Sequence, residues 1–331
     1  MRRLVIASIV LASAVAPVQG QTRAASCATR TPQGFATQDA CEKARDLFDY
    51  MMPQLGTALV GGSHTLGLGT TLGGFPHFAI ALRGNAVRGN VPDIQSISVS
   101  PDSAVRSNVS TNPQFIGLPG IDFALGIWKG LPLGVSRVGG IDLIGSVTYV
   151  PNIENADGGV NIFTTDGSTK IGLGARVGIL EQSLVVPGVS FSYLKRDVPT
   201  LDLTASGGNA EFALRDFSVE TTSWRLAAQK NLLLFQLGAG LGQDTYQSAA
   251  HITVTVNDPL IPGESASTTS NPDQSLTRTT MYGSVGFNLF LAKVVAEIGR
   301  VSGGDVNTYN RFDEAADKSR MYGSLGLRIS F

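Results

Sequence analysis

After about residue 55 the hydrophobic pattern has a period of two, which is typical of β-strands with two different faces. The clearest case is the last segment of the chain, Ser319–Phe331. Its apolar face carries Met321, Leu325, Leu327, Ile329 and Phe331. Its other face is polar or glycine-rich. Since a transmembrane strand needs about 9–11 residues, this segment is long enough to cross a membrane.

The same alternation recurs along the chain. Together with the last segment it predicts strands near 76–87, 120–130, 139–150, 168–180, 187–196, 218–229, 233–247, 276–290, 293–302 and 319–331. A further pair near 55–62 and 64–71 brings the number to about 12, and a hairpin of Leu201–Thr204 with Glu211–Leu214 would bring it to about 14. The sequence therefore predicts an all-β fold, an antiparallel transmembrane β-barrel of about 12 strands (range about 10–14) with a short N-terminal helical segment.

Short and long connections alternate between these strands. Short ones include Glu181–Val186, Lys230–Leu232 and Leu291–Ala292, whereas the segments 88–119, 151–167, 197–217, 257–274 and 303–318 are long and polar. Outer-membrane barrels have short periplasmic turns and long external loops. Apolar and polar residues also alternate in the strands of a soluble β-sandwich, so alternation alone does not distinguish the two folds. The strand length, the export signal and the order of short and long loops favour the membrane barrel.

The N-terminus has the features of a secretory signal peptide. Met1-Arg2-Arg3 is basic, residues 4–16 are apolar, and cleavage after Gly20 is expected. Residues 21–54 form a periplasmic or plug segment with one helix, which begins near an N-cap at Thr37 and ends at Pro53. The barrel is expected to occupy residues 55–331. Cys27 and Cys41 are expected to form a disulfide in the oxidising periplasm, with two unpaired thiols as the alternative.

Composition agrees with a membrane barrel. Charged residues make up 15% of the chain, against about 25% in soluble domains, and 39 residues are glycine. The formal net charge of −1 gives no indication of nucleic acid as a partner. No segment after the signal has the roughly 20 continuous apolar residues of a membrane-spanning helix.

Charged side chains fall on the face opposite the apolar one, which in a membrane barrel faces the lumen. They are Asp122, Asp142, Lys170, Arg176, Arg225, Glu297 and Arg328. Two interpretations stay open: a selectivity lining of a water-filled pore, or cross-pairing that supports the wall. Among the aromatic residues near strand ends, Trp224, Tyr149 and Tyr193 fit an interface girdle, whereas Trp128 falls on the lumen register.

No motif of enzyme or metal chemistry stands out. His64, His77 and His251 show no metal-ligand spacing, and His64 and His77 are expected on neighbouring strands. There is no Gly-x-Ser-x-Gly elbow, so no hydrolase triad can be chosen. We therefore expect no metal, no cofactor and no enzymatic activity.

The signal peptide, the N-terminal helix, the strand pattern and the ending Arg-Ile-Ser-Phe331 together resemble Gram-negative outer-membrane proteins. This resemblance implies export to the cell outer membrane and Phe331 as part of a signal for the barrel assembly machinery. The stretch Ser63-His-Thr-Leu-Gly-Leu-Gly before Phe78-Ala-Ile-Ala-Leu also resembles the long-chain fatty-acid porin family. No ligand residue is carried over.

Passive transport of small or hydrophobic solutes is the first functional hypothesis. Outer-membrane lipid, the barrel assembly machinery and a hydrophobic small molecule are the expected partners. The second hypothesis is a structural or surface-interaction barrel acting through its external loops, and an embedded lipid hydrolase ranks third.

Overall fold

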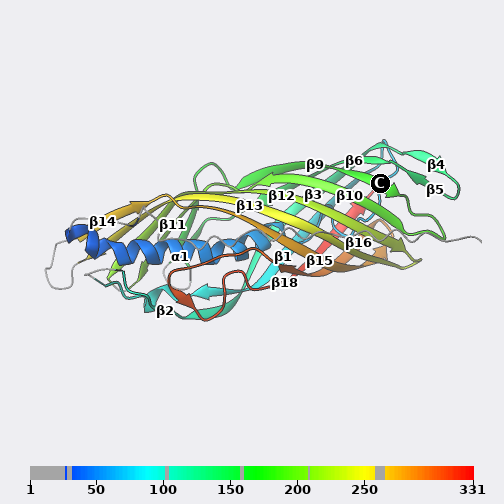
Figure 1. Ribbon diagram of the computed structural model, residues 1–331. Helices are drawn as coiled ribbons and strands as arrows, with labels where there is room; N and C mark the ends of the chain where they lie inside the picture. The colour runs from blue at the N-terminus through cyan, green and yellow to red at the C-terminus, as the bar shows by residue number, and fades with distance from the viewer. Residues whose placement is uncertain (1–26, 28–31, 101–103, 157–159, 208, 258–264) are drawn as a thin grey trace, which may run out of the picture.

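A computed structural model describes Cys27 and residues 32–100, 104–156, 160–207, 209–257 and 265–331; the expected signal peptide lies outside these residues. The chain forms one long helix and a series of antiparallel strands (Figure 1). The elements are α1 (Pro32–Val60), β1 (Phe78–Pro92), η2 (Ile94–Ser96), β2 (Asn108–Val109), β3 (Thr111–Trp128), β4 (Leu131–Leu133), β5 (Ser136–Val138), β6 (Ile141–Tyr149), β7 (Ile153–Ala156), β8 (Val160–Thr164), β9 (Thr169–Leu180), β10 (Gly188–Asp197), β11 (Leu201–Gly207), β12 (Ala210–Asn231), β13 (Phe235–Asn257), β14 (Ser265–Ser270), β15 (Asp273–Leu289), β16 (Ala292–Ser302), β17 (Arg311–Phe312) and β18 (Arg320–Ser330).

Ten strands of the described chain close into a ring. Their order is β13-β15-β16-β18-β1-β3-β6-β9-β10-β12, and β12 pairs with β13 again. The first and last ring strands meet at Phe78 and Phe331, whose backbone N–H groups each donate to the other's carbonyl over 2.9 Å. The closed antiparallel ring confirms the predicted barrel, and all ten strands predicted from residue 76 onward are present.

Side chains on each ring strand alternate between the outside and the interior. On β1, Leu82 is 59% exposed and its neighbour Arg83 is 4% exposed; on β18, Leu325 is 61% exposed. Apolar residues therefore form the outer face of the ring, and polar residues face inward. This is the arrangement that a bilayer around the barrel requires.

The predicted strand pair 55–62 and 64–71 is wrong. The helix α1 continues to Val60, past the expected segment boundary at residue 54, and residues 61–77 form neither helix nor strand. Gly62 and Gly67 have φ values of +76° and +70°, which no regular strand contains. The apolar residues of this segment pack against the barrel interior: Leu66 is fully buried with Ala81 and Val295.

Pro53 was expected to end the helix but lies inside it. Proline costs about 3 kcal/mol or more in a helix interior because it lacks the N–H. Contacts of the next residues in the helix with the barrel wall offset this cost. The Gln54 side chain donates to the carbonyl of Asn90 over 3.0 Å and accepts from its N–H over 2.6 Å, and Gly56 lies against the Tyr246 ring.

The two ends of the barrel differ. One end has short connections, including the two-residue turn between β15 and β16 and the small hairpin β4–β5. At the other end β12 and β13 reach 22 and 23 residues, roughly 70–75 Å. By the loop rule for outer-membrane barrels this second end is external. The predicted hairpin near 201–214 exists as β11 with β12, but it extends the sheet outside the membrane and adds no strand to the ring.

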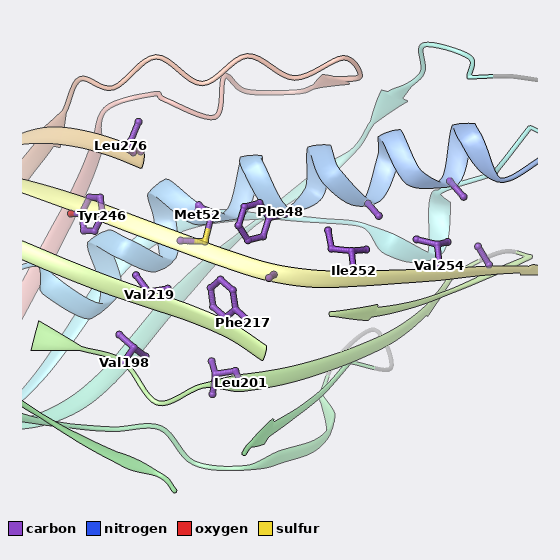
Figure 2. Packing of buried hydrophobic residues seen from close by; sticks show 14 of the residues in the cluster. Phe48, Met52, Val198, Leu201, Phe217, Val219, Tyr246, Ile252, Val254 and Leu276 are labelled. Carbon is purple, nitrogen blue, oxygen red and sulfur yellow. The ribbon is translucent and has the colours of Figure 1, made fainter. Parts of the chain in front are cut away.

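The external extension of the sheet has its own hydrophobic core. Phe48 and Met52 of α1 pack against Phe217 of β12 and Ile252 of β13 (Figure 2). The Phe48 and Phe217 rings meet edge to face, with their centroids 6.1 Å apart. Burial of this helix face is what holds α1 along the sheet, since an amphipathic helix is stabilised mainly by packing.

Trp128 lies outside the barrel and not on the lumen register. The pairing of β3 with β6 shifts between Gly126 and Trp128, which is a β-bulge. A bulge inserts one residue and reverses the facing of those that follow. Trp128 is therefore 43% exposed on the outer surface, where its ring faces lipid.

Glycine and tyrosine alternate across four neighbouring strands. Gly240 pairs with Tyr282, Tyr282 with Gly299, and Gly299 with Tyr322. A Cβ atom at Gly299 would overlap the Tyr322 ring. The similar sequences at 281–290 and 321–331 therefore each place an inward tyrosine over a glycine of a neighbouring strand: Tyr282 over Gly240, and Tyr322 over Gly299.

Replacing Gly299 by valine is expected to cost about 1–3 kcal/mol in the free energy of unfolding, because the Tyr322 ring must move. Urea unfolding in detergent micelles measures this. The matched control is Gly84→Val, since no atom lies within 4 Å of a Cβ at Gly84. Equal losses for the two variants would contradict the packing argument.

Candidate functional site

The N-terminal segment runs lengthwise through the barrel. We call residues 32–77 the plug. Its helix contacts β1, β3 and β18 as well as β12, β13 and β14, so ring strands surround it (Figure 1). The helix begins at the external end, and residues 61–77 continue to the turn end, where β1 starts. The C-terminal end of the helix therefore lies in the interior, where Ala58 packs with Val87 and Tyr322, whereas its first half lies against the external extension of the sheet.

Side chains of the barrel wall bind the backbone of residues 61–77, which we call the lower plug. The guanidinium of Arg328 donates to the carbonyl of Leu66, and the amide of Gln236 donates to the carbonyl of Gly67. The N–H of Gly69 donates to Gln229 over 2.8 Å, and the N–H of Leu72 donates to both oxygens of Asp142 over 3.1 Å. These bonds satisfy backbone groups that would otherwise be buried without partners.

His64 links the plug to two strands of the wall. Its Nδ1 lies 2.7 Å from the hydroxyl oxygen of Ser192 on β10, and its Nε2 lies 2.7 Å from that of Ser223 on β12. The prediction that His64 and His77 lie on neighbouring strands is wrong, because both precede β1. Both ring nitrogens of His64 bind hydroxyls, so no carboxylate orients the imidazole as in a hydrolase triad.

The plug contacts nearest the turn end of the barrel involve Glu181, in the turn between β9 and β10. Its carboxylate accepts from the hydroxyls of Thr70 and Thr71. A charge-assisted hydrogen bond is roughly twice as strong as a neutral one. A pair of such bonds therefore fixes Thr70 and Thr71 of the plug to the turn end of the barrel.

The structure places six of the seven predicted lumen charges inside the barrel. Asp122 binds Arg83 over 2.7 Å, Arg176 binds Asp142 over 3.2 Å, and Arg225 binds Asp244 over 3.0 Å. Glu297 accepts from the Tyr322 hydroxyl over 2.9 Å, and Arg328 binds the plug.

Lys170 is the exception among the predicted charges. It lies at the external end of β9, where it pairs with Asp166, and its side chain is 35% exposed. The alternation places it on the inward register, but the strand there has left the enclosed part of the lumen. Lys170 therefore binds a loop residue at the external end instead of a plug or wall group inside the lumen.

Four further charged side chains of the wall, which the sequence pattern did not single out, bind other wall or plug groups. They are Arg83, Arg196, Asp244 and Arg278. All four lie on predicted strands, and continuing the inward register would have found Arg83 between Leu82 and Gly84. Arg196 and Arg278 donate to the plug carbonyls of Leu59 and Pro53, each over 3.4 Å.

The external half of α1 is held by two external loops. Asp46 accepts from the N–H of Asn310 over 2.6 Å and from the N–H of Tyr309 over 2.9 Å. Asp39 accepts from the N–H of Ser100 over 2.8 Å. The carboxylates of the helix therefore bind backbone donors, which are the partners that stabilise a buried carboxylate.

The structure contains the expected Cys27–Cys41 disulfide, with 5.7 Å between the Cα atoms. Cys41 lies in the third turn of the described helix. The bridge ties the chain before the helix to the helix itself, at the external end of the barrel.

Asp49 makes the plug sensitive to pH. Burial raises the pKa of this carboxyl from 3.8 to about 7; Arg45, 3.9 Å away, lowers it, and the nearby Asp46 and Asp273 raise it. Since the folded pKa exceeds the unfolded one, the folded protein binds a proton more tightly between about pH 4 and 7. Stability therefore falls as pH rises through that range.

We expect the wild type to lose on the order of 2–4 kcal/mol relative to Asp49→Asn between about pH 4 and 8. The asparagine retains an acceptor for Gln274, which donates to Asp49 over 3.1 Å. Urea unfolding at a series of pH values measures the difference. Asp305→Asn, at an exposed loop position, should follow the wild type. Parallel curves for wild type and Asp49→Asn would show that Asp49 does not carry the effect.

Little free space is left where the plug meets the wall. A pocket lined by Ser63, His64, Ser192 and Glu297 holds about 10 Å³. This is about the volume that one water molecule needs. With the plug in this position the lumen does not form an open pore there.

Among the described residues no helix is both long and apolar enough to cross a membrane. In the same part of the chain no group of His, Cys, Asp and Glu side chains is arranged to hold a metal ion.

No protein-family model and no curated protein matches the chain. Among solved structures, the transport unit of the autotransporter AIDA-I from Escherichia coli is 10% identical, with a TM-score of 0.36, over 87% of this chain and 99% of that one. A TodX mutant, a monoaromatic hydrocarbon channel, is 8% identical (TM-score 0.26; 77% and 89% covered), and a Pseudomonas aeruginosa FadL homologue is 9% identical (TM-score 0.23; 77% and 90% covered).

The barrel assignment rests on the molecule's own geometry. A closed antiparallel ring, an apolar outer face and short turns at one end are the architecture of outer-membrane proteins. The chain is an outer-membrane β-barrel whose lumen is filled by its own N-terminal segment.

Proposed function

We propose that the protein is a plugged channel that passes small or hydrophobic solutes passively when the plug moves. The observation that carries the proposal is the polar contact between the lower plug and the wall. Hydrogen bonds to water can replace those made by Arg328, Gln236 and Gln229. The two bonds of the glutamines therefore contribute only about 0.5–1.5 kcal/mol net each, and the bond of the charged Arg328 contributes about 1.5–3 kcal/mol. A plug held in this way can be displaced without unfolding the ring.

The charge of the wall bears on the solute. The buried arginines Arg83, Arg176, Arg196, Arg225, Arg278 and Arg328 outnumber the buried wall carboxylates Asp122, Asp142, Asp244 and Glu297. The arginines without a carboxylate partner donate to backbone carbonyls of the plug. Because a carbonyl carries no net charge, the positive charge of these arginines is not neutralised. An opened lumen would therefore favour small anions over cations.

The proposed activity needs no cofactor and no catalytic residue. Its partners would be the solute, the surrounding outer-membrane lipid and, during assembly, the barrel assembly machinery. Phe331 is a suitable assembly signal because its ring is 60% exposed on the outer surface at the end of β18.

Planar-bilayer recording of the full chain tests the proposal. The wild type should be closed most of the time, and a variant with a loosened plug, Leu66→Ala, should open often and pass chloride better than potassium. If the variant folds but the bilayer stays sealed, passive transport is the wrong function.

The alternative is a surface-interaction barrel. The external core around Phe48, Phe217 and Ile252 supports it, because this core stabilises a part of the sheet that membrane insertion does not require. A sealed bilayer with both wild type and variant would favour this second function.

A further inference from the structure

A groove of about 620 Å³ lies on the outer wall of the barrel, across β12, β13, β15, β16 and β18. Small residues line it in the middle: Ala228, Ala239 and Gly283. Larger apolar residues surround these positions: Leu226, Leu241, Ile298 and Met321. The side chains that face outward here meet the hydrocarbon of the membrane, so the groove is accessible from the lipid.

One cation lies at the external end of this groove. On β16 the outward residues Val294, Ala296 and Ile298 are apolar, and the next outward residue is Arg300. Arg300 pairs across the sheet with Met281 on one side and with Met321 on the other. Since the apolar band ends at this row, the guanidinium lies at the level of lipid headgroups.

A second hollow adjoins the groove at Met321. It measures about 510 Å³ and is lined by Arg88, Asn90, Lys318 and Arg320 among others. The carboxylates facing it are Asp313 and Glu314, and Glu314 is already paired with Lys318 and Arg320. Arg88 and Arg300 form no ion pair with any described residue.

We propose that this place binds one phosphate-bearing lipid of the outer leaflet, with an acyl chain in the groove and the phosphate between Arg300 and Arg88. Charge complementarity identifies the occupant: arginine recognises phosphate through two parallel hydrogen bonds, and the groove below accepts only apolar groups. The site lies outside the wall, so it does not depend on the plug or on solute passage.

The test uses the full-length protein in mild detergent and native mass spectrometry. The probes are dioleoyl phosphatidic acid, dioleoylglycerol with the same chains but no phosphate, and inorganic phosphate. We expect phosphatidic acid to be retained, dioleoylglycerol to be lost and inorganic phosphate to compete poorly. Full competition by inorganic phosphate, or equal retention of both lipids, would overturn the proposal.

Variants locate the site. Arg88→Gln with Arg300→Gln should weaken phosphatidic acid binding at least about tenfold, which is the loss of one or two charge-assisted contacts. Ala239→Leu should also weaken it by filling the groove, and because its side chain faces outward the ring should still fold. The control Arg137→Gln removes an exposed arginine at the turn end and should change nothing. Unchanged binding in the double variant would place the lipid elsewhere.

Discussion

Replacing Arg225 by alanine is expected to lower the free energy of unfolding by about 3–5 kcal/mol. Arg225 donates to Asp244 over 3.0 and 3.2 Å, and the carboxylate of Asp244 is fully buried. Without the guanidinium, the one hydrogen bond left to this carboxylate from the described residues would be that of the Thr280 hydroxyl, which donates to it over 2.6 Å. Removing one partner of a buried ion pair leaves an uncompensated charge, and this is the source of the large cost.

Urea unfolding of the refolded barrel in micelles measures the effect. The matched control is Lys195→Ala, which breaks the ion pair with Glu220 at the surface, where the side chains are 55% and 53% exposed. An exposed pair contributes about 0–1 kcal/mol, so this variant should remain close to the wild type. Equal losses for the two variants would show that the interior is far wetter than the structure indicates.

A double variant separates the effect of losing the Arg225–Asp244 ion pair from the effect of losing side-chain packing. Arg225→Met combined with Asp244→Val removes both charges and keeps the combined side-chain volume close to that of the pair. This double variant is expected to recover most of the stability lost in Arg225→Ala, because apolar replacement of a buried pair is often neutral.

Replacing Leu66 by alanine is expected to open the channel. Leu66 is fully buried in the plug and packs against Ala81 and Val295 of the wall. A buried leucine-to-alanine change costs about 2–5 kcal/mol, and every 1.4 kcal/mol is a factor of ten in an equilibrium. Since Leu66 is not part of the ring, this cost falls on the docked plug. The docked-to-displaced ratio should fall by about 30-fold or more.

Single-channel recording in planar bilayers measures the open fraction. Leu184→Ala is the matched control, because this leucine is 95% exposed in a turn of the wall. It should leave the open fraction unchanged. A Leu66→Ala protein that is folded but opens no more often than the control would contradict a displaceable plug.

The sequence was sufficient for the ring because its signals are local. Alternation, turn residues and the register counted from Phe331 placed all ten ring strands, and the inward register placed Arg176, Arg225 and Arg328 on the interior face. Trp128 was misplaced because a single bulge residue reverses the register, and nothing in the local composition marks it.

The plug could not be predicted in the same way. Leu55, Leu66 and Leu68 alternate with glycine and small residues much as strand residues do. What keeps them out of the sheet is the interior of the barrel, which is formed by residues far along the chain. The contacts of His64 with Ser192 and Ser223 span 128 and 159 residues, and no local pattern encodes them.

Hydrogen exchange of residues 61–72 in lipid bilayers tests the plugged lumen most directly. This segment has no helix or strand. Apart from the amides of Gly61 and Leu68, which donate to the nearby carbonyls of Thr57 and Thr65, its amides depend for protection on enclosure in the barrel and on bonds such as Gly69 to Gln229 and Leu72 to Asp142. With the plug in the lumen, mass spectrometry should show these amides exchanging far more slowly than those of the external loop 303–308, which contains no helix or strand, over minutes to hours. Exchange of both segments at the same fast rate would contradict a plug that fills the barrel.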